Sequence, residues 1–322
     1  LNITTYDEIL LCLKRTLNNL LLCKRKIHII VLISKLPIWY KLYSTSVDFI
    51  LLESNIFNEL KKLDEGSISI NSVKNTNKYV KYLNMKGKFH NKDKGLKYFI
   101  GLTYYFNLPN SKKSKYIGLI DADDFISKKI VNVLNSIPEK YNMYMVDNGY
   151  LMFAKNMNTS LNIKSIYPIS NFSDICGSNR FFKSDFLQAL FYKRFAKFYH
   201  GLNLYMLMKH KRVNNFLIDT IIKDINNNYK SWTILPLFLG KHRIFENRAY
   251  LHPYLKNFTI AKITDNIVIK YIHTTNHSTG TFNQNNDIKI ERNLINRYKS
   301  EGLIDKKKNG TNNLNSVIDK FF

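Results

Sequence analysis

The chain has 322 residues, 45% hydrophobic and 14% aromatic, a composition that excludes a disordered protein and allows one large or two small domains. Its 49 Lys and Arg residues outnumber its 24 Asp and Glu residues, and the net charge of +25 favours an anionic partner. The three cysteines, Cys12, Cys23 and Cys176, lack metal-site spacing, which predicts buried thiols in a reducing compartment and argues against a disulfide framework.

The first third of the chain alternates helical and strand patterns. Apolar residues at helical spacing predict an amphipathic helix over residues 4–23. Apolar runs then predict two buried strands, Ile27–Ile33 and Phe49–Leu52, and a helix is expected over residues 55–63. A polar stretch to about residue 91 precedes a further helix over residues 94–106.

The middle of the chain is richer in strands. The run Tyr116–Ile120 is short, apolar and preceded by a turn, which predicts a fully buried parallel strand. Met143–Val146 and Tyr150–Phe153 are predicted to be further strands. Strands alternating with helices favour a mostly parallel sheet with helices on both faces, so the expected class is α/β.

The second half carries weaker patterns. Apolar residues from Val213 to Ile225 follow helical spacing, and the basic run Lys209–Arg212 is expected at the N-terminal end of that helix. Ile267–Ile272 is predicted to be a strand.

These patterns divide the chain into an N-terminal helix over residues 1–26, a domain over residues 27–290 and a basic C-terminal tail over residues 291–322. No apolar run reaches the roughly 20 residues that a membrane-spanning helix needs. We therefore expect a cytoplasmic protein that charge can hold peripherally at the inner face of the cell membrane.

The most informative motif is Asp121-Ala122-Asp123-Asp124, directly after the predicted strand Tyr116–Ile120. Side chains two apart in an extended chain share a face, so Asp121 and Asp123 can converge on one cation. Hard oxygen ligands of this kind suit Mg²⁺ or Mn²⁺. The alternative is a simple helix cap, in which Asp124 or Ser127 begins the helix expected near residue 128.

The order of these segments resembles the nucleotide-sugar glycosyltransferases of GT-A fold, particularly the family 2-like bacterial enzymes. The stretch Tyr116–Phe125 matches best, as the strand that ends in a D-x-D motif. The other matching segments are Ile29–Val31 with Ser34 and Pro37, Ile50–Ser54, Asp93–Lys97 with Gly101 and Leu102, and Gly177–Asn179.

The resemblance implies a three-layer α/β/α fold of GT-A type with a mostly parallel central sheet and a variable C-terminal region. It implies transfer of a sugar from a nucleoside-diphosphate donor to a glycan or lipid-linked acceptor in bacterial surface polysaccharide synthesis. Residues 27–155 would be the nucleotide-sugar half and residues 156–290 the acceptor half. An anionic membrane surface is a further expected partner, and nucleic acid is disfavoured.

The resemblance also assigns donor contacts. Ser34 and Glu53, at the ends of the first two strands, would hold the nucleoside, and Lys97 would reach the donor. Glu53 stands where the family usually has an Asp, and the family's Ala-Arg-Asn triplet is absent from this chain.

The resemblance assigns metal binding to the acidic motif. Asp121 and Asp123 would bind Mn²⁺ or Mg²⁺ bridging the diphosphate, with Ala122 between them in the donor site. Many enzymes of this fold complete the metal shell with a late His, and His273, directly after the strand Ile267–Ile272, is the residue that we assign to it.

The catalytic base is the least regular part of the resemblance. Family 2 enzymes carry an Asp at a helix start where this chain has the run Lys209–Arg212. A neutral His210 would accept the proton of the acceptor hydroxyl, because neighbouring cations lower the pKa of a His. Asp219 is the alternative base, and a retaining mechanism, which needs no such base, stays open.

Two other functions compete with this prediction. A nucleotidyltransferase would share the sheet and the metal carboxylates, but it normally has a glycine-rich loop after its first strand, where this chain has Ser34-Lys35-Leu36-Pro37. A non-catalytic nucleic-acid-binding protein would explain the charge. Such a protein needs basic residues interleaved with exposed aromatic residues, whereas the aromatic residues here fall mostly within apolar stripes.

Overall fold

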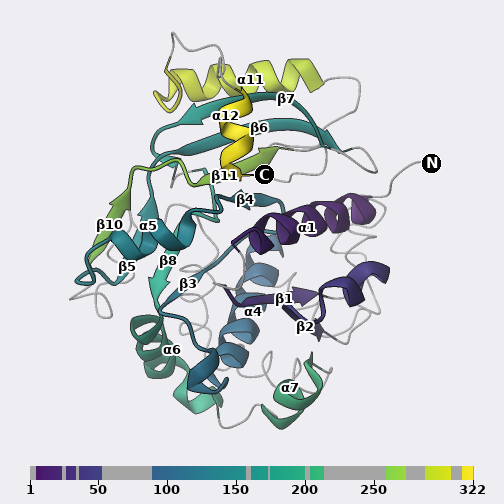
Figure 1. The fold of residues 1–322 in the computed structure, drawn as a ribbon, viewed down its shortest axis with the longest axis vertical. Coiled ribbons are helices and arrows are strands. Elements are labelled where there is room, and N and C mark those ends of the chain that lie inside the picture. The colour runs from purple at the N-terminus through teal and green to yellow at the C-terminus, as the bar shows by residue number, and fades with distance from the viewer. Residues whose placement is uncertain are drawn as a thin grey trace. The chain divides into compact units, whose positions relative to one another are not determined.

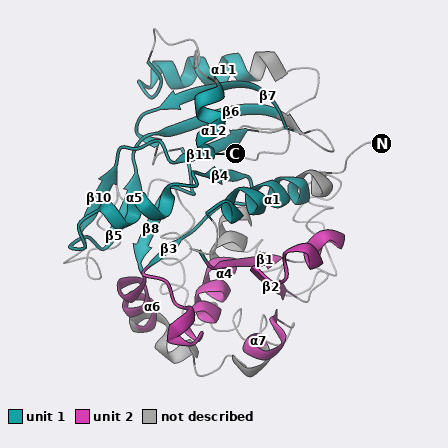
Figure 2. Ribbon diagram, viewed as in Figure 1, with its two compact units in different colours: residues 1–27, 116–183, 257–322 teal, residues 28–115, 184–256 magenta. Residues whose placement is uncertain are grey.

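The structure is a computed structural model, and it is divided into two compact units that each combine segments distant in the sequence (Figure 2). Unit 1 contains residues 1–27, 116–183 and 257–322, and unit 2 contains residues 28–115 and 184–256. The residues that the structure describes are 5–23, 27–33, 36–52, 89–156, 161–172, 175–199, 204–213, 259–272, 287–305 and 314–321.

In its described residues, unit 2 contains a parallel sheet of order β1-β2-β9, of which Figure 1 labels β1 and β2. Its strands are β1 (Ile29–Ile33), β2 (Val47–Leu52) and β9 (Arg212–Val213), and the first two confirm the predicted strands. The 3₁₀ helix η2 (Ile38–Tyr43) connects β1 to β2. Most residues of β1 and β2 are apolar and buried, as expected of parallel strands that are covered on both faces.

The helices of unit 2 are rich in aromatic residues. The α-helices in its described residues are α4 (Phe89–Phe106), α6 (Ser184–Tyr199) and α7 (Leu204–His210), with the short 3₁₀ helix η4 (Asn110–Lys112) after α4. Phe191 of α6 lies 5.2 Å from Phe99 and 5.3 Å from Phe106 of α4, measured between ring centroids. These three side chains are almost fully buried, so ring packing joins α4 to α6.

Unit 1 contains two mixed sheets. The first has the order β10-β5-β8-β3, formed by β3 (Tyr116–Gly118), β5 (Met143–Val146), β8 (Arg180–Lys183) and β10 (Ile260–Ile263). The second has the order β4-β11-β6-β7, formed by β4 (Asp124–Ile126), β6 (Gly149–Asn156), β7 (Leu161–Ile169) and β11 (Val268–Ile272).

The class α/β is confirmed, but the expected mostly parallel sheet is too simple a description. Among the described strands of unit 1, the pairs β10–β5 and β11–β6 are parallel and the other pairs are antiparallel. The strands predicted over 143–146, 150–153 and 267–272 are confirmed as β5, β6 and β11, since an apolar run indicates a strand without indicating its direction.

Strand β3 differs from its prediction in both burial and direction. It is an edge strand, antiparallel to β8, and Gly118 at its end is exposed. Gly118 pairs with Phe181, and a Cβ atom at position 118 would lie 2.7 Å from the Phe181 ring. The glycine therefore allows the aromatic ring of β8 to cross the end of β3.

The helices of unit 1 cover these sheets. They are α1 (Thr5–Leu21), α5 (Ile130–Ser136), α11 (Asp287–Ser300) and α12 (Leu314–Phe321), and α1 confirms the predicted N-terminal helix. The region expected to form a basic tail supplies α11 and α12, and it contributes buried side chains: Ile295, Tyr298, Leu303, Ile304, Val317 and Phe321.

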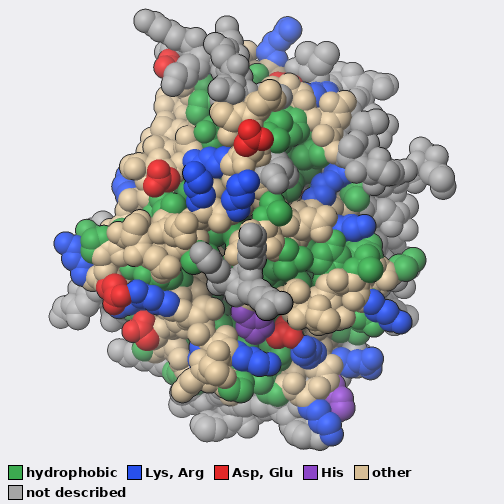
Figure 3. Space-filling view, in the orientation of Figure 1, with side chains coloured by type: hydrophobic (Ala, Val, Ile, Leu, Met, Phe, Trp, Pro, Cys, Tyr) green, Lys and Arg blue, Asp and Glu red, His purple; other side chains and the backbone are tan. Residues whose placement is uncertain are grey.

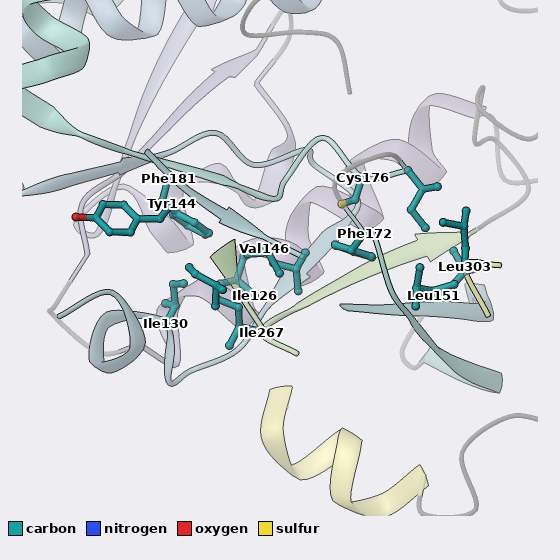
Figure 4. Close-up of a cluster of buried hydrophobic side chains, with 14 of the residues drawn as sticks. Ile126, Ile130, Tyr144, Val146, Leu151, Phe172, Cys176, Phe181, Ile267 and Leu303 are labelled. Carbon is teal, nitrogen blue, oxygen red and sulfur yellow. The ribbon is translucent and has the colours of Figure 1, made fainter. Parts of the chain in front are cut away.

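A large apolar cluster holds unit 1 together (Figure 4). It joins β4, β5, α5 and the segment before β11 through buried side chains that include Ile126, Ile130, Val146 and Ile267. Figure 4 also shows Cys176 beside Phe172 in this cluster, and the predicted burial of the cysteines is confirmed for Cys12, Cys23 and Cys176. Among the described residues, no helix is both long enough and apolar enough to cross a membrane.

The basic run 209–212 is placed differently from its prediction. Lys209 and His210 end helix α7, Lys211 has a positive φ of 51°, and Arg212 begins β9. Cations at a helix C-terminus complement the macrodipole, which removes the conflict that the predicted position created. The rest of the predicted helix to Ile225, and the helix over residues 55–63, lie outside the described residues.

Candidate metal centre in unit 1

The acidic motif forms a tight turn between β3 and β4. The backbone N–H of Asp124 donates to the carbonyl of Asp121 at 3.2 Å, which folds the four residues back on themselves. As a result, one carboxylate oxygen from each of Asp121, Asp123 and Asp124 lies within 4.8 Å of the others. The predicted convergence of Asp121 and Asp123 is therefore present, and Asp124 joins them.

The three carboxylates extend from the surface into the interior. Asp121 and Asp123 are partly exposed, Ala122 is exposed, and Asp124 is only 3% exposed. Three hard oxygen donors with one open side are a donor set suited to Mg²⁺ or Mn²⁺, which usually keep positions for water or phosphate oxygens. The residues present thus fit a divalent cation.

Helix α1 supports the turn through two buried polar side chains. The hydroxyl of Thr16 donates to the carbonyls of Ala122 at 2.8 Å and Asp124 at 3.0 Å. The Asn19 side chain accepts from the backbone N–H of Ile126 at 2.7 Å and donates to the carbonyl of Phe321 at 2.6 Å. The path of the acidic turn is therefore fixed by hydrogen bonds from residues remote in the sequence.

The segment before β8 supports the turn from another direction. The Ser178 hydroxyl accepts from the backbone N–H of Asp121 at 2.6 Å and also hydrogen-bonds the Asp124 carboxylate. The thiol of Cys176 donates to Asp124 Oδ2 at 3.3 Å. Ser178 and Cys176 are both fully buried, so the inner carboxylate has protein donors in place of water.

Burial and like charge dominate the electrostatics of Asp124. Its burial, and then the negative charges of Asp123 and Asp121, raise the pKa of Asp124 to about 8. The Ser178 hydrogen bond and the positive charge of Lys270 oppose this rise without cancelling it. Lys270 of β11 is the strand partner of Asp124 in β4, and its ammonium donates to the carbonyl of Ile175.

The Cys176 thiol is held in its neutral form by the same surroundings. Its burial, and then the charge of Asp124, raise the pKa of Cys176 well above its ordinary value. A neutral thiol is a hydrogen-bond donor, in agreement with its contact to Asp124. Cys176 is therefore a structural partner of the acidic turn and has none of the features of a reactive thiolate.

The alternative role of Asp124 as a helix cap is wrong. Asp124 begins β4, and its carboxylate faces Ser178 and Cys176. Ser127, the other predicted cap, accepts from the N–H of Lys129 at 3.3 Å, just ahead of α5. The local sequence is compatible with Asp124 as a helix cap or as a member of the acidic cluster. The burial of Asp124 between β11 and α1 selects the second role.

The other predicted site residues are either in unit 2 or outside the described residues. Lys97 lies on α4 and is partly exposed, and His210 is exposed at the end of α7. The predicted donor, base and metal residues outside the described residues are Ser34, Glu53, Asp219 and His273.

Sequence reasoning missed the residues that hold the turn. Thr16 and Asn19 are polar residues on the buried, otherwise apolar face of α1. Polar residues on such a face indicate buried hydrogen bonds, and this pattern in the sequence could have identified them. Ser178 was assigned to an acceptor segment, whereas it contacts Asp121 and Asp124. Lys270 had a signal too, as a lone charge within a strand whose other residues are apolar or aromatic.

A second cluster of charged groups lies in unit 2, around Asp48 at the start of β2. The Asp48 carboxylate accepts from His28 Nε2 at 2.9 Å, from the Tyr104 hydroxyl at 3.0 Å and from the Lys211 ammonium. Burial alone would raise the pKa of Asp48, but the hydrogen bonds from His28, Lys211 and Tyr104 and the charge of Lys211 hold that pKa well below its ordinary value.

This cluster joins segments of all three parallel strands. His28 precedes β1 and Asp48 is the second residue of β2, so both lie near the amino end of that strand pair. Lys211 precedes β9, which pairs with Leu51 and Leu52 at the carboxyl end of β2, and its ammonium donates to Asp48. Asp48 therefore ties the three strand segments together, which is the role of a structural group.

Asp48→Asn is expected to destabilise the protein by roughly 1–3 kcal/mol at pH 7, because it leaves its donors poorly paired. The pKa of Asp48 is lower in the folded protein than in the unfolded chain, where it is about 3.9. The ionised Asp48 therefore stabilises the fold fully above about pH 3.9, and this contribution is lost as the pH falls below that value. Urea unfolding at pH 7 and pH 3.5 should therefore show a gap between parent and variant that shrinks in acid.

Tyr104→Phe, which removes one of the three donors, is the matched control and should lose less stability than Asp48→Asn. Equal stability of Asp48→Asn and the parent at pH 7 would contradict the assigned role.

Unit 1 thus holds three carboxylates that can bind a divalent cation, with one open side and a rigid hydrogen-bonded base. Unit 2 holds a parallel sheet with a structural charge cluster around Asp48. Comparisons with protein family models, curated proteins and solved structures found nothing that matches the chain.

Proposed function

We propose that the protein is a metal-dependent glycosyltransferase of GT-A type that moves a sugar from a nucleoside-diphosphate donor to a glycan or lipid-linked acceptor. The observation that carries this proposal is the Asp121, Asp123 and Asp124 cluster, in which oxygen ligands lie within 4.8 Å of one another. The resemblance of residues 116–125 to the D-x-D strand of that family supports the same assignment.

Asp121 and Asp123 are proposed to hold Mn²⁺ or Mg²⁺ together with the donor diphosphate. When bound, the cation would offset the negative charge that grows on the departing nucleoside diphosphate. Their partial exposure suits this role, because the cation must reach both protein and donor oxygens. Asp124 is the inner carboxylate, and its contacts with Ser178 and Cys176 keep the turn in shape.

The remaining donor contacts stay as the resemblance assigns them. Ser34, Glu53 and Lys97 are proposed to contact the donor, with Ala122 beside the cation and His273 as a further metal ligand. Lys97 is available for this role as a partly exposed cation on α4.

His210 is proposed as the proton acceptor for the acceptor hydroxyl, with Asp219 as the alternative. His210 is exposed at the end of α7, next to Lys209 and Lys211. We expect His210→Ala to lower the rate of transfer by about 10²–10⁴-fold without weakening donor binding, as loss of a general base does. Steady-state transfer assays measure this, and an unchanged rate would favour Asp219 or a retaining mechanism.

The basic surface is proposed to favour anionic partners. The net charge is +25, and basic side chains recur across the face drawn in Figure 3, where acidic side chains are fewer. A phosphorylated or acidic glycan acceptor and an anionic membrane surface both match this charge.

The direct test is a calorimetric screen of UDP, GDP and CDP with and without Mn²⁺. The proposal predicts that at least one nucleoside diphosphate binds only when the cation is present. Incubation of the binding nucleotide's sugars with the protein should then release the nucleoside diphosphate. Metal-dependent turnover of nucleoside triphosphates would instead support a nucleotidyltransferase, and tight binding of nucleic acid without any nucleotide would support the third candidate.

A further inference from the structure

The segment η2 exposes apolar side chains to an unusual degree. Ile38 is 100% exposed and Leu42 is 75% exposed, and Leu22 at 40% is the one other large hydrophobic residue exposed in the described part of the chain. Two aliphatic side chains within six residues are therefore largely exposed, and their apolar area stays in contact with water.

The exposure is built into the fold and does not come from a loose loop. The Trp39 ring meets the buried Tyr43 ring edge-on at 5.4 Å, and Tyr40 meets Phe49 of β2 edge-on at 6.2 Å. The Tyr40–Phe49 contact and the burial of Tyr43 attach the aromatic side of η2 to the rest of unit 2. The remaining side chains of η2, which are Ile38, Lys41 and Leu42, are left exposed.

Hydrogen bonds order the backbone of η2. The N–H of Tyr40 donates to the carbonyl of Pro37 at 3.0 Å, and the Ser44 hydroxyl donates to the carbonyl of Lys41 at 2.9 Å. The exposed side chains of η2 are therefore held on a hydrogen-bonded helical turn.

We propose that η2 is a membrane-contacting element that inserts Ile38 and Leu42 among the acyl chains of an anionic lipid surface. Its composition fits the interface, where Trp and Tyr are enriched and Lys pairs with lipid phosphates. The net charge of +25 supplies the long-range attraction that a short apolar segment needs.

A protein partner is the less favoured occupant. A stable protein interface buries about 800 Å² on each partner, which is far more than two side chains of a six-residue segment provide. Insertion of a few side chains, helped by charge, is in contrast a common mode of peripheral membrane binding. The role of η2 extends the proposed function, because a lipid-linked acceptor would be found at the same surface.

Vesicle sedimentation tests the proposal without any donor or acceptor. The parent should bind phosphatidylglycerol vesicles and bind phosphatidylcholine vesicles weakly, and the double variant Ile38→Ser/Leu42→Ser should bind the anionic vesicles at least about tenfold less. Lys41→Gln should lose less. Leu22→Ser removes an exposed leucine in unit 1 and should bind as the parent does.

A second readout uses the two tryptophans of the chain, Trp39 and Trp232. In a Trp232→Phe background, anionic vesicles should shift the Trp39 emission to shorter wavelength, and the double variant should show no shift. Equal vesicle binding by parent and double variant would overturn the proposal. The proposal would also be overturned if the double variant lost a self-associated state of the parent while its vesicle binding stayed unchanged. In that case η2 would contact a second copy of the chain.

The two proposals fail separately. The double variant is expected to keep metal-dependent binding of the nucleoside diphosphate in vesicle-free solution. Loss of vesicle binding with nucleotide binding intact therefore concerns η2 alone, and absence of nucleotide binding in the parent concerns the glycosyltransferase proposal alone.

Discussion

Asp121→Asn and Asp123→Asn are each expected to abolish metal-dependent binding of nucleoside diphosphates while the protein stays folded. Each substitution removes one charged oxygen ligand from the cluster and leaves the backbone of the turn unchanged. The loss in Mn²⁺ affinity should exceed the about 10–100-fold that follows removal of an outer-shell partner. Titration calorimetry of Mn²⁺ with UDP, GDP and CDP measures the effect.

Asp265→Asn is the matched control, because Asp265 is an exposed aspartate of the same unit outside the acidic turn. It makes the same change in net charge, so it reports any loss that comes from long-range electrostatics alone. If the two site variants bind nucleotide and metal as well as the control does, the assigned metal centre is wrong, and with it the main support for a glycosyltransferase.

Asp124→Asn should make the protein more stable at neutral pH. The native pKa of Asp124 is raised to about 8, so the folded protein keeps a proton that the unfolded chain releases above about pH 4. Stability from this group is therefore complete below about pH 4 and declines as the pH rises to about 8. Asn resembles the protonated carboxyl and cannot ionise, so it removes the decline.

The expected gain at pH 7 is on the order of 1–4 kcal/mol, or about 2–4 °C in Tm for each kcal/mol. Thermal unfolding at pH 4 and pH 7 should show a gap between parent and variant that opens with pH. The same variant should bind Mn²⁺ more weakly, since it lacks the third carboxylate. Asp265→Asn again serves as the control, and a variant less stable than the parent at pH 7 would contradict the assignment.

These two predictions concern the same carboxylate cluster, the first through its binding of a cation and the second through its effect on stability. A carboxylate that is unfavourable in the folded protein alone is retained beside two others, where a bound cation would offset the repulsion. If the proposed cation binds there, the site gives up stability for ligand binding, a common trade in functional sites.

The sequence predicted the elements with strong periodicity and the core of the site. The apolar stripe of α1, the runs of β1, β2, β5, β6 and β11, and the spacing of Asp121 and Asp123 are local properties that a short window contains. Local patterns also sufficed for the burial of the three cysteines, since a free cysteine behaves as a small apolar residue.

The failures have a common physical cause. The direction of β3 depends on its pairing with β8, and the role of Asp124 depends on burial by residues from α1, β11 and the segment before β8. The basic run 209–212 is compatible with a position before a helix or after one, and the end of α7 at His210 decides between the two. Each of these features is decided by contacts between distant segments, which no local pattern records.

The hydrogen bond from Asn19 to Phe321 joins residues 302 positions apart, and Asn19 also holds the strand that follows the acidic turn. This link closes only when α1 and α12 have both packed onto unit 1. Contacts of such long sequence separation raise the contact order of a domain, which goes with slower folding. The shape of the acidic turn therefore depends on the assembly of the whole unit and not on its local sequence alone.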